Sequence, residues 1–172
     1  VDYTVLEPVA MTSTTIGTNA SCFGVCDGTA STTASGGTTP YTYLWSNAQT
    51  TSTATALCAG AASVTITDNN GCFIVDSYMV TEPTAVAAVT AGNPTSCNGV
   101  CDGDATVTPS GGTGAYTYSW NTTPVQTTAT ATGLCAGTFN VTVSDANGCQ
   151  ALSSFVVTQP TALGSSTTGN PT

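Results

Sequence analysis

The chain has 172 residues and carries nine acidic side chains but no Lys, Arg or His, which gives a formal net charge of −9. Without basic groups it has nothing to attract the phosphates of nucleic acids or an anionic membrane surface, so both classes of binding are excluded. Most acid–base and nucleophilic enzymes use His or Lys. Carboxylate chemistry, metal binding through oxygen or thiolate, or a purely structural role is left.

The predicted secondary structure is all-β. Thr, Ser, Ala, Val and Gly dominate the chain; Thr and Val favour strands, whereas strong helix formers other than Ala are nearly absent. Alternating apolar and polar residues, separated by turn-forming Gly, Pro and Asn, mark six strands in the first half of the chain. In chain order they are expected at residues 10–16, 29–35, 41–46, 52–56, 62–67 and 73–80.

This spacing predicts an immunoglobulin-like β-sandwich, which is built from six or seven short strands with a turn every 8–12 residues. A Trp on the third strand is the usual centre of such a core, and both halves of the chain have one. The residues expected to face the core are Tyr43, Trp45, Val64, Ile66, Tyr118, Trp120, Phe139, Val141 and Val143.

The second half of the chain repeats the first. Residues 22–28, Cys-Phe-Gly-Val-Cys-Asp-Gly, return 75 residues later as Cys-Asn-Gly-Val-Cys-Asp-Gly. Residues 57–60, Leu-Cys-Ala-Gly, and the Asp-x-Asn-Gly-Cys segment at 68–72 return after 77 residues, because of a two-residue insertion near 122–126. A fixed period of this kind is typical of a tandem array of structural units.

The repeat predicts the domain boundaries. Residues 1–8 are expected to be the last strand of a preceding repeat, and residues 9–83 and 84–160 two complete β-sandwich repeats of about 75–77 residues. Residues 161–172 match the opening of a following repeat. The eight cysteines, an even number, predict that the repeats are stapled by disulfides and located in an oxidising, extracellular environment. No apolar run is long enough to cross a membrane.

Four motifs in fixed order, C-x-G-x-C-D-G, G-G-x-x-x-Y-T-Y-x-W, L-C-A-G and D-x-N-G-C, resemble the SprB-type repeat of very large surface adhesins of gliding Bacteroidota. The Tyr-x-Trp strand is also loosely similar to PKD-type modules. One departure is Ala62, where the second repeat has the more typical aromatic residue, Phe139. The resemblance implies a parent protein that is exported by the type IX secretion system, anchored outside the cell and involved in surface attachment or gliding.

The expected function is that of a structural stalk or filament segment of such an adhesin, with neighbouring repeats as its partners. Two alternatives remain open: a module that binds polysaccharide or another cell, and a subunit of a fibre assembled from several copies. The predicted inward orientation of Tyr and Trp favours the stalk, since a carbohydrate-binding module would expose an aromatic platform. An enzyme is not expected, because the scattered carboxylates offer no catalytic pair. No cofactor is expected either.

Metal binding is also not expected. Asp68 to Gly71 and Asp145 to Gly148 carry oxygen ligands that a Ca²⁺ site could use, but Asp and Asn before Gly are the usual residues of a hairpin turn. The four cysteines of a repeat lack the two closely spaced pairs of a structural zinc site. Asp27 and Asp102 are interpreted as turn caps.

The disulfide pairing is predicted from the strand order. The strand at 62–67 places Cys58 roughly 20 Å from Cys72, whereas bridged Cα atoms lie within about 7 Å, so this pair is excluded and Cys22–Cys26 with it. In an immunoglobulin-like Greek key the second strand begins at the end where the turn at Cys58 lies, which pairs Cys26 with Cys58. The complete prediction is Cys26–Cys58 with Cys22–Cys72, and Cys101–Cys135 with Cys97–Cys149.

Overall fold

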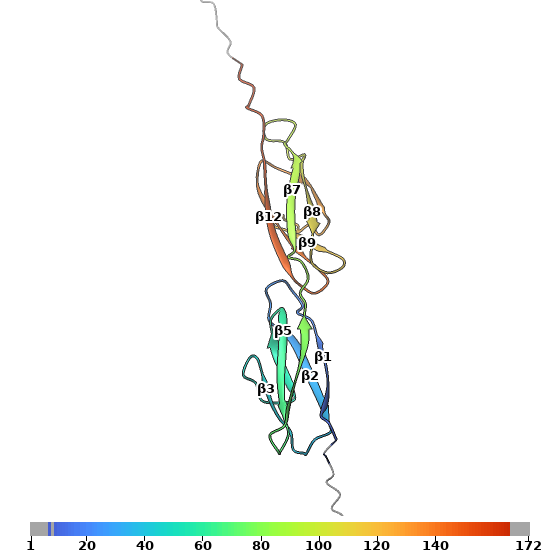
Figure 1. Ribbon diagram of the computed structural model, residues 1–172. Helices are drawn as coiled ribbons and strands as arrows, with labels where there is room; N and C mark the ends of the chain where they lie inside the picture. The colour runs from blue at the N-terminus through green and yellow to red at the C-terminus, as the bar shows by residue number, and fades with distance from the viewer. Residues whose placement is uncertain (1–6, 8, 166–172) are drawn as a thin grey trace, which may run out of the picture. The chain divides into compact units, whose positions relative to one another are not determined.

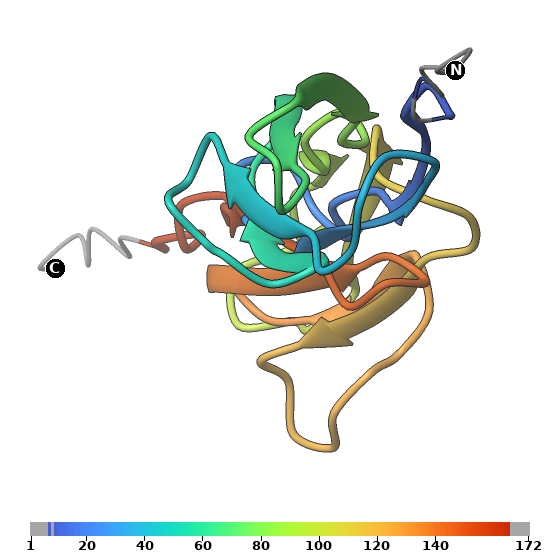
Figure 2. The same ribbon diagram turned by 60° about the horizontal axis from the view of Figure 1, so that its bottom comes forward.

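The computed structural model describes residue 7 and residues 9–165, and its regular secondary structure consists of strands alone (Figures 1 and 2). The chain divides into two compact units between Thr84 and Ala85. Within the described residues no helix could span a membrane. The assignments of residues 1–6, 8 and 166–172 to neighbouring repeats lie outside the described residues.

Each unit has six strands, and each predicted strand of unit 1 overlaps an observed one. The strands of unit 1 are β1 (Thr12–Thr18), β2 (Gly28–Ser35), β3 (Thr42–Trp45), β4 (Thr53–Leu57), β5 (Gly60–Thr67) and β6 (Phe73–Val80). Those of unit 2 are β7 (Ala87–Asn93), β8 (Gly103–Ser110), β9 (Thr117–Trp120), β10 (Thr130–Leu134), β11 (Gly137–Ser144) and β12 (Gln150–Val157).

The strands of a unit form two antiparallel three-stranded sheets. In unit 1 the strand orders are β1-β2-β4 and β3-β5-β6, and unit 2 repeats them as β7-β8-β10 and β9-β11-β12. Because β6 continues into the connection to β7, the chain enters a unit at the start of its first strand and leaves it beyond the end of its sixth (Figure 1).

One apolar core in each unit takes side chains from both of its sheets. Trp45 on β3 is only 2% exposed, and its indole N–H donates to the backbone carbonyl of Thr51 (2.8 Å). Of the side chains expected to face the core, the buried ones are Trp45, Val64, Ile66, Trp120, Val141 and Val143. Tyr43, Tyr118 and Phe139 are partly buried and pack against the two clusters.

The sequence analysis did not name several of the buried residues. The opposite sheet contributes small side chains, such as Ala30 and Ala54, which face each other across β2 and β4 and are both fully buried. Leu57 and Val80 are buried in the same core cluster of unit 1. Because Ala is abundant throughout this chain, its positions did not distinguish a buried strand face from an exposed one.

Candidate functional site

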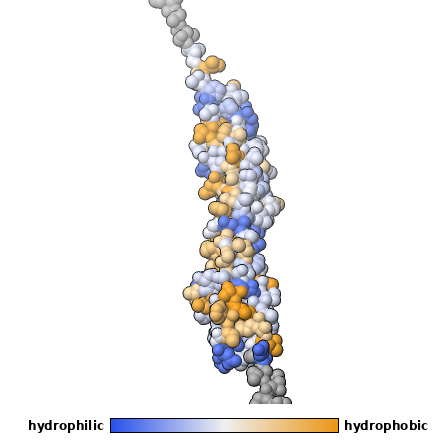
Figure 3. All heavy atoms as spheres, in the orientation of Figure 1, coloured by the Kyte–Doolittle hydropathy of each residue, from blue (hydrophilic) through white to orange (hydrophobic). Residues whose placement is uncertain are grey.

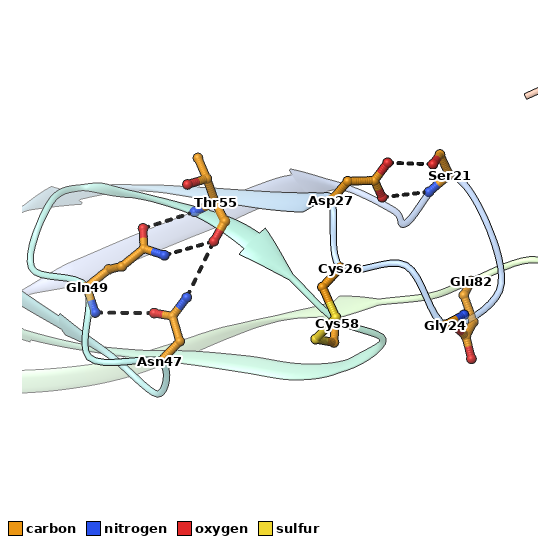
Figure 4. The surroundings of a disulfide bond; sticks show 9 residues. All are labelled: Ser21, Gly24, Cys26, Asp27, Asn47, Gln49, Thr55, Cys58 and Glu82. Carbon is orange, nitrogen blue, oxygen red and sulfur yellow. Dashed lines mark hydrogen bonds between the residues drawn. A yellow bond between two sulfur atoms is a disulfide. The ribbon is translucent and has the colours of Figure 1, made fainter.

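A disulfide closes one end of each unit. Cys26 is bonded to Cys58 and Cys101 to Cys135, which are the two inner pairs expected from the strand order. Cys26 lies just before β2, and Cys58 lies in the short turn between β4 and β5 (Figure 4). The bond therefore fixes the point at which the chain crosses from one sheet of the unit to the other.

The loop that carries the first two cysteines of each repeat is hydrogen-bonded to the segment that directly follows the sixth strand. In unit 1, the Ala20 N–H donates to the carbonyl of Thr81 (2.9 Å), and the Gly24 N–H donates to a carboxylate oxygen of Glu82 (2.6 Å; Figure 4). Unit 2 makes the second contact with an amide oxygen, since the Gly99 N–H donates to Gln159 (3.0 Å). A carboxylate and an amide thus perform the same structural task.

Asp27 and Asp102 close the first turn of the same loop. Asp27 accepts hydrogen bonds from the hydroxyl and the backbone N–H of Ser21, and Asp102 does the same with Ser96 (Figure 4). The Ser21 hydroxyl, followed by its N–H, lowers the pKa of Asp27 below its ordinary value. These contacts agree with the interpretation of the two carboxylates as turn caps.

A glutamine side chain covers part of the outer edge of β4. The Gln49 amide donates to the carbonyl of Thr55 (2.8 Å) and accepts from its N–H (3.1 Å; Figure 4). Gln126 binds Thr132 on β10 in the same way, with both distances 3.0 Å. The sequence analysis missed this contact, although a Gln at equivalent positions of the two repeats was a signal for it.

At the opposite end of each unit, one aspartate organises the turn before the sixth strand. Asp68 is 6% exposed and accepts N–H groups from Thr38, Asn70 and Cys72, each at 2.9 Å. Asp145 accepts the three equivalent N–H groups of unit 2. Gly37, with φ +62°, lies so close that a Cβ there would be 2.8 Å from an Asp68 oxygen, so a side chain at this position would disturb the turn.

These hydrogen bonds also determine what the turn can bind. Both oxygens of Asp68 already accept backbone N–H groups. Among the residues that the structure describes, no three His, Cys, Asp or Glu side chains are close enough to hold a metal ion together. The arrangement is that of a turn cap.

Chelation of divalent ions is therefore expected to leave thermal stability unchanged, because the carboxylate oxygens of the two turns bind backbone N–H groups. The measurement is the melting temperature by circular dichroism, with and without excess EDTA. A decrease of more than about 10 °C, which corresponds to roughly 1–3 kcal/mol for a domain of this size, would contradict the assignment.

Acidification, in contrast, is expected to destabilise the units. The Thr38 N–H, with smaller contributions from Cys72, Asn70 and Gly71, holds the pKa of Asp68 below its ordinary value despite burial. A lowered folded-state pKa means that the ionised group stabilises the fold above the unfolded value of about 3.9, and that this stability is lost as the pH falls through the folded pKa.

The test compares the free energies of unfolding of the wild type and D68N at pH 7 and at several values below pH 4. D68N should lower stability at neutral pH and weaken the acid dependence of unit 1. E82Q is the control for the loss of one negative charge, because Gln159 holds its position in unit 2. An acid dependence of unit 1 that is the same in D68N and wild type would refute the role of Asp68.

The predicted outer disulfides are wrong. Cys72 and Cys97 are exposed free thiols, so neither Cys22–Cys72 nor Cys97–Cys149 is formed. The reason is their placement at opposite ends of the unit. Cys72 directly precedes β6, whereas the loop of Cys22 is bonded to Thr81 and Glu82 beyond the other end of that strand.

Comparison with known families places the chain among repeats. The family model described as the SprB repeat matches residues 14–50 and, a second time, residues 89–124. Each match begins within the first strand of a unit and extends past the Tyr-x-Trp strand. A search of curated proteins gives no match.

Proposed function

Since this chain is a member of the SprB repeat family, we propose that it is a stalk or filament segment of a secreted cell-surface adhesin. In this role each unit acts as a mechanically resistant spacer that holds adhesive regions away from the cell. The disulfides and the family are consistent with an extracellular or surface location. Export across an outer membrane and participation in gliding belong to the same proposal.

The observation that carries the proposal is that the polar networks shared by the two units bind the units' own backbone. The Asp27, Gln49 and Asp68 contacts, and their counterparts in unit 2, all end on backbone N–H or C=O groups or on a neighbouring hydroxyl. The described Tyr and Trp side chains are buried or half-buried, so they form no exposed platform for sugars. Duplicated residues that serve only the fold are what a spacer requires.

We further propose that each unit is an immunoglobulin-like sandwich. The orders β1-β2-β4 and β3-β5-β6 correspond to strands A-B-E and C-F-G of that fold, without its D strand. Trp45 on β3 takes the position of the usual core Trp of strand C. Such a unit has its entry and exit at opposite ends, so a pulling force along the chain loads the whole length of its sheets.

Single-molecule force spectroscopy tests the stalk. A chain pulled by its two ends should give two unfolding events of similar force, one for each unit. An intact disulfide prevents the residues between its two cysteines from being extended by the force, and these cysteines are 32 and 34 positions apart. At ~3.6 Å for each extended residue, reduction should therefore lengthen each event by roughly 120 Å.

Two outcomes of the pulling experiment decide whether the chain has the mechanical resistance of a stalk. Events that lengthen on reduction and that resist forces typical of β-sandwiches support the spacer role. A chain that extends without distinct force peaks has no mechanical resistance, and this result would exclude a stalk. The double variant C26S/C58S provides the control, because it should lengthen only one of the two events without any reductant.

A fibre assembled from several chains is a second candidate, favoured by one apolar surface. On the outer side of β6, Phe73, Val75 and Met79 are 61–65% exposed, and apolar side chains gather on the visible face of unit 1 in Figure 3. Exposed apolar patches often mark protein contacts. If this surface drives assembly, sedimentation velocity should show concentration-dependent oligomers that V75T reduces; a monomer at all concentrations would reject the fibre.

A further inference from the structure

The turn before the sixth strand contains an Asn-Gly pair in both units. Asn70-Gly71 lies between β5 and β6, and Asn147-Gly148 lies between β11 and β12. All four residues are exposed. An asparagine followed by glycine can react with its own backbone. The side-chain amide carbon and the nitrogen of the next residue can close a ring, and glycine has no side chain that would obstruct this closure.

Crowding by neighbouring atoms does not protect these pairs. A Cβ placed on Gly71 or on Gly148 would have no atom of another segment within 4 Å, so the space beside both glycines is open. The groups that can keep the two asparagines in their amide form are therefore the hydrogen-bond partners of the turn.

In the closed turn, the backbone nitrogen that would attack already donates a hydrogen bond. The Gly71 N–H donates to the carbonyl of Asp68, and the Gly148 N–H donates to that of Asp145, both at 3.1 Å. Attack requires this nitrogen to lose its proton and to approach the side-chain carbon, so the hydrogen bond has to break first. The Asp68 carboxylate, which accepts the N–H of Asn70 at 2.9 Å, also places negative charge close to an amide that would have to become an anion.

The side-chain amide that would be attacked is held in place as well. The Asn70 side-chain N–H donates to the hydroxyl of Thr38 (2.9 Å), which lies between β2 and β3. Thr38 is itself fixed, because its N–H donates to the Asp68 carboxylate (2.9 Å) and its carbonyl accepts the N–H of Asn69 (2.8 Å). While these bonds persist, the Asn70 side chain cannot rotate toward the nitrogen of Gly71.

We propose that Asn70 and Asn147 are sites of non-enzymatic deamidation, and that the hydrogen bonds around Asp68 and Asp145 control when they react. A closed turn keeps the amide, whereas an opened turn allows the Asn-Gly pair to react. This modification is independent of the proposed stalk, because it requires only water and an opened turn.

The reaction needs no oxidant or reductant. The Gly71 nitrogen loses its proton and forms a bond to Cγ of Asn70, and the side-chain nitrogen leaves as ammonia, which gives a cyclic succinimide. Water then opens the ring at one of its two carbonyls. Cleavage of the new C–N bond gives aspartate, and cleavage of the original peptide bond gives isoaspartate, in which the main chain runs through the side chain.

Neither product restores the original turn. Aspartate has no N–H to donate to the Thr38 hydroxyl, and it places a second carboxylate next to Asp68. Isoaspartate also lengthens the main chain by one methylene, which displaces the Cys72 N–H from the Asp68 oxygen that it binds at 2.9 Å. A turn that has reacted therefore stays altered, and each reaction adds one negative charge to the formal −9 of the chain.

Peptide mapping after incubation in mildly alkaline buffer, followed by reduction and alkylation, measures the reaction. A protease that cuts before Asp releases residues 68–75 and 145–172, each with one Asn-Gly pair. Aspartate at position 70 raises the mass of 68–75 and adds a cut that gives 68–69 and 70–75, whereas isoaspartate raises the mass without a new cut. Asn69 is the internal control, because the side chain of the residue that follows it hinders ring closure.

The first comparison is between the folded chain and the same chain unfolded in guanidinium chloride with reductant. Asn70 and Asn147 should react more than about tenfold more slowly in the folded chain, because only the opened fraction of each turn reacts. Equal rates in the two states would overturn the proposal.

The second comparison isolates the Thr38 hydroxyl. T38V keeps the backbone contacts of Thr38 but lacks the hydroxyl, so Asn70 should react about two- to tenfold faster, the factor expected from the loss of one hydrogen bond. Asn147 of the same chain should keep its wild-type rate. T38S retains the hydroxyl and should react at Asn70 like the wild type. An unchanged Asn70 rate in T38V, or an equal acceleration at Asn147, would contradict the role of the turn.

Melting temperatures of T38V and T38S check that both variants fold. Failure of this proposal is also separate from failure of the stalk. Two unfolding events in the pulling experiment, combined with equal deamidation rates in the folded and the unfolded chain, would keep the stalk and reject the protected turn.

Discussion

Removal of the Cys26–Cys58 bridge by C26S/C58S is expected to destabilise unit 1 by about 4 kcal/mol, because the bond closes a 32-residue loop in the unfolded chain. A domain of this size has a small core and a net stability of only 5–15 kcal/mol, so the loss is a large fraction of the total. The melting temperature of unit 1 should fall by roughly 15–30 °C.

The chain offers an internal readout for this experiment. Trp45 lies in the core of unit 1 and Trp120 in that of unit 2, and they are the only two Trp residues, so each reports on its own unit. In a W120F background, the fluorescence of Trp45 should follow the destabilised transition. C101S/C135S is the matched control, since it opens the equivalent loop of unit 2. A change of less than about 1 kcal/mol in unit 1 would show that the bridge is dispensable.

Truncation of the core Trp is expected to have an effect of similar size. W45A removes the largest fully buried side chain of unit 1 and should cost about 3–5 kcal/mol, partly as lost burial and partly as the cavity left behind. The neighbouring L44A is the matched control. Leu44 lies on the opposite face of β3 and is 55% exposed, so its truncation should change stability by less than about 0.5 kcal/mol.

Calorimetry and fluorescence together test this prediction. In W45A, the transition of unit 1 should move to lower temperature, while Trp120 reports an unchanged transition of unit 2. Equal losses in W45A and L44A would mean that β3 is oriented differently from the structure. A shift of both units in W45A would mean that the units do not unfold independently.

The strands and the inner disulfides were predictable because their signals are local. Alternation placed Val64 and Ile66 on one face of a strand, and a turn motif fixed Cys58 at a strand end. The outer cysteines were not predictable in this way, since their pairing was assigned by elimination on the assumption that each repeat forms its disulfides within itself. The eight residues of β6 hold Cys22 and Cys72 at opposite ends of unit 1, and elimination among the four cysteines of a repeat did not take this length into account.

Hydrogen bonds between side chains and the backbone were the second feature that could not be predicted from the sequence. Gln49 could be seen to recur as Gln126, but its sequence neighbours gave no indication that it would bind Thr55 on a strand edge. Asp68 was correctly assigned to a turn from the Asn-Gly that follows it, whereas its hydrogen bond with Thr38 joins residues 30 positions apart. The alternation of apolar residues and the types of residue in turns contain information about neighbouring positions only. Long-range hydrogen-bond partners depend instead on how the two sheets pack together.

The hydrogen bonds of Gln49 with Thr55 bear on how closely placed copies of the chain would avoid aggregation. β4 is the outermost strand of its sheet, and a free strand edge is a template on which another chain can add by β-pairing. Lys on the edge, a common protection, does not occur in this protein. The glutamine instead occupies both the donor and the acceptor that an incoming strand would need at Thr55. In the proposed stalk, neighbouring chains with Thr-rich sheets and without any basic side chain are thereby denied one of the sites where aggregation would begin.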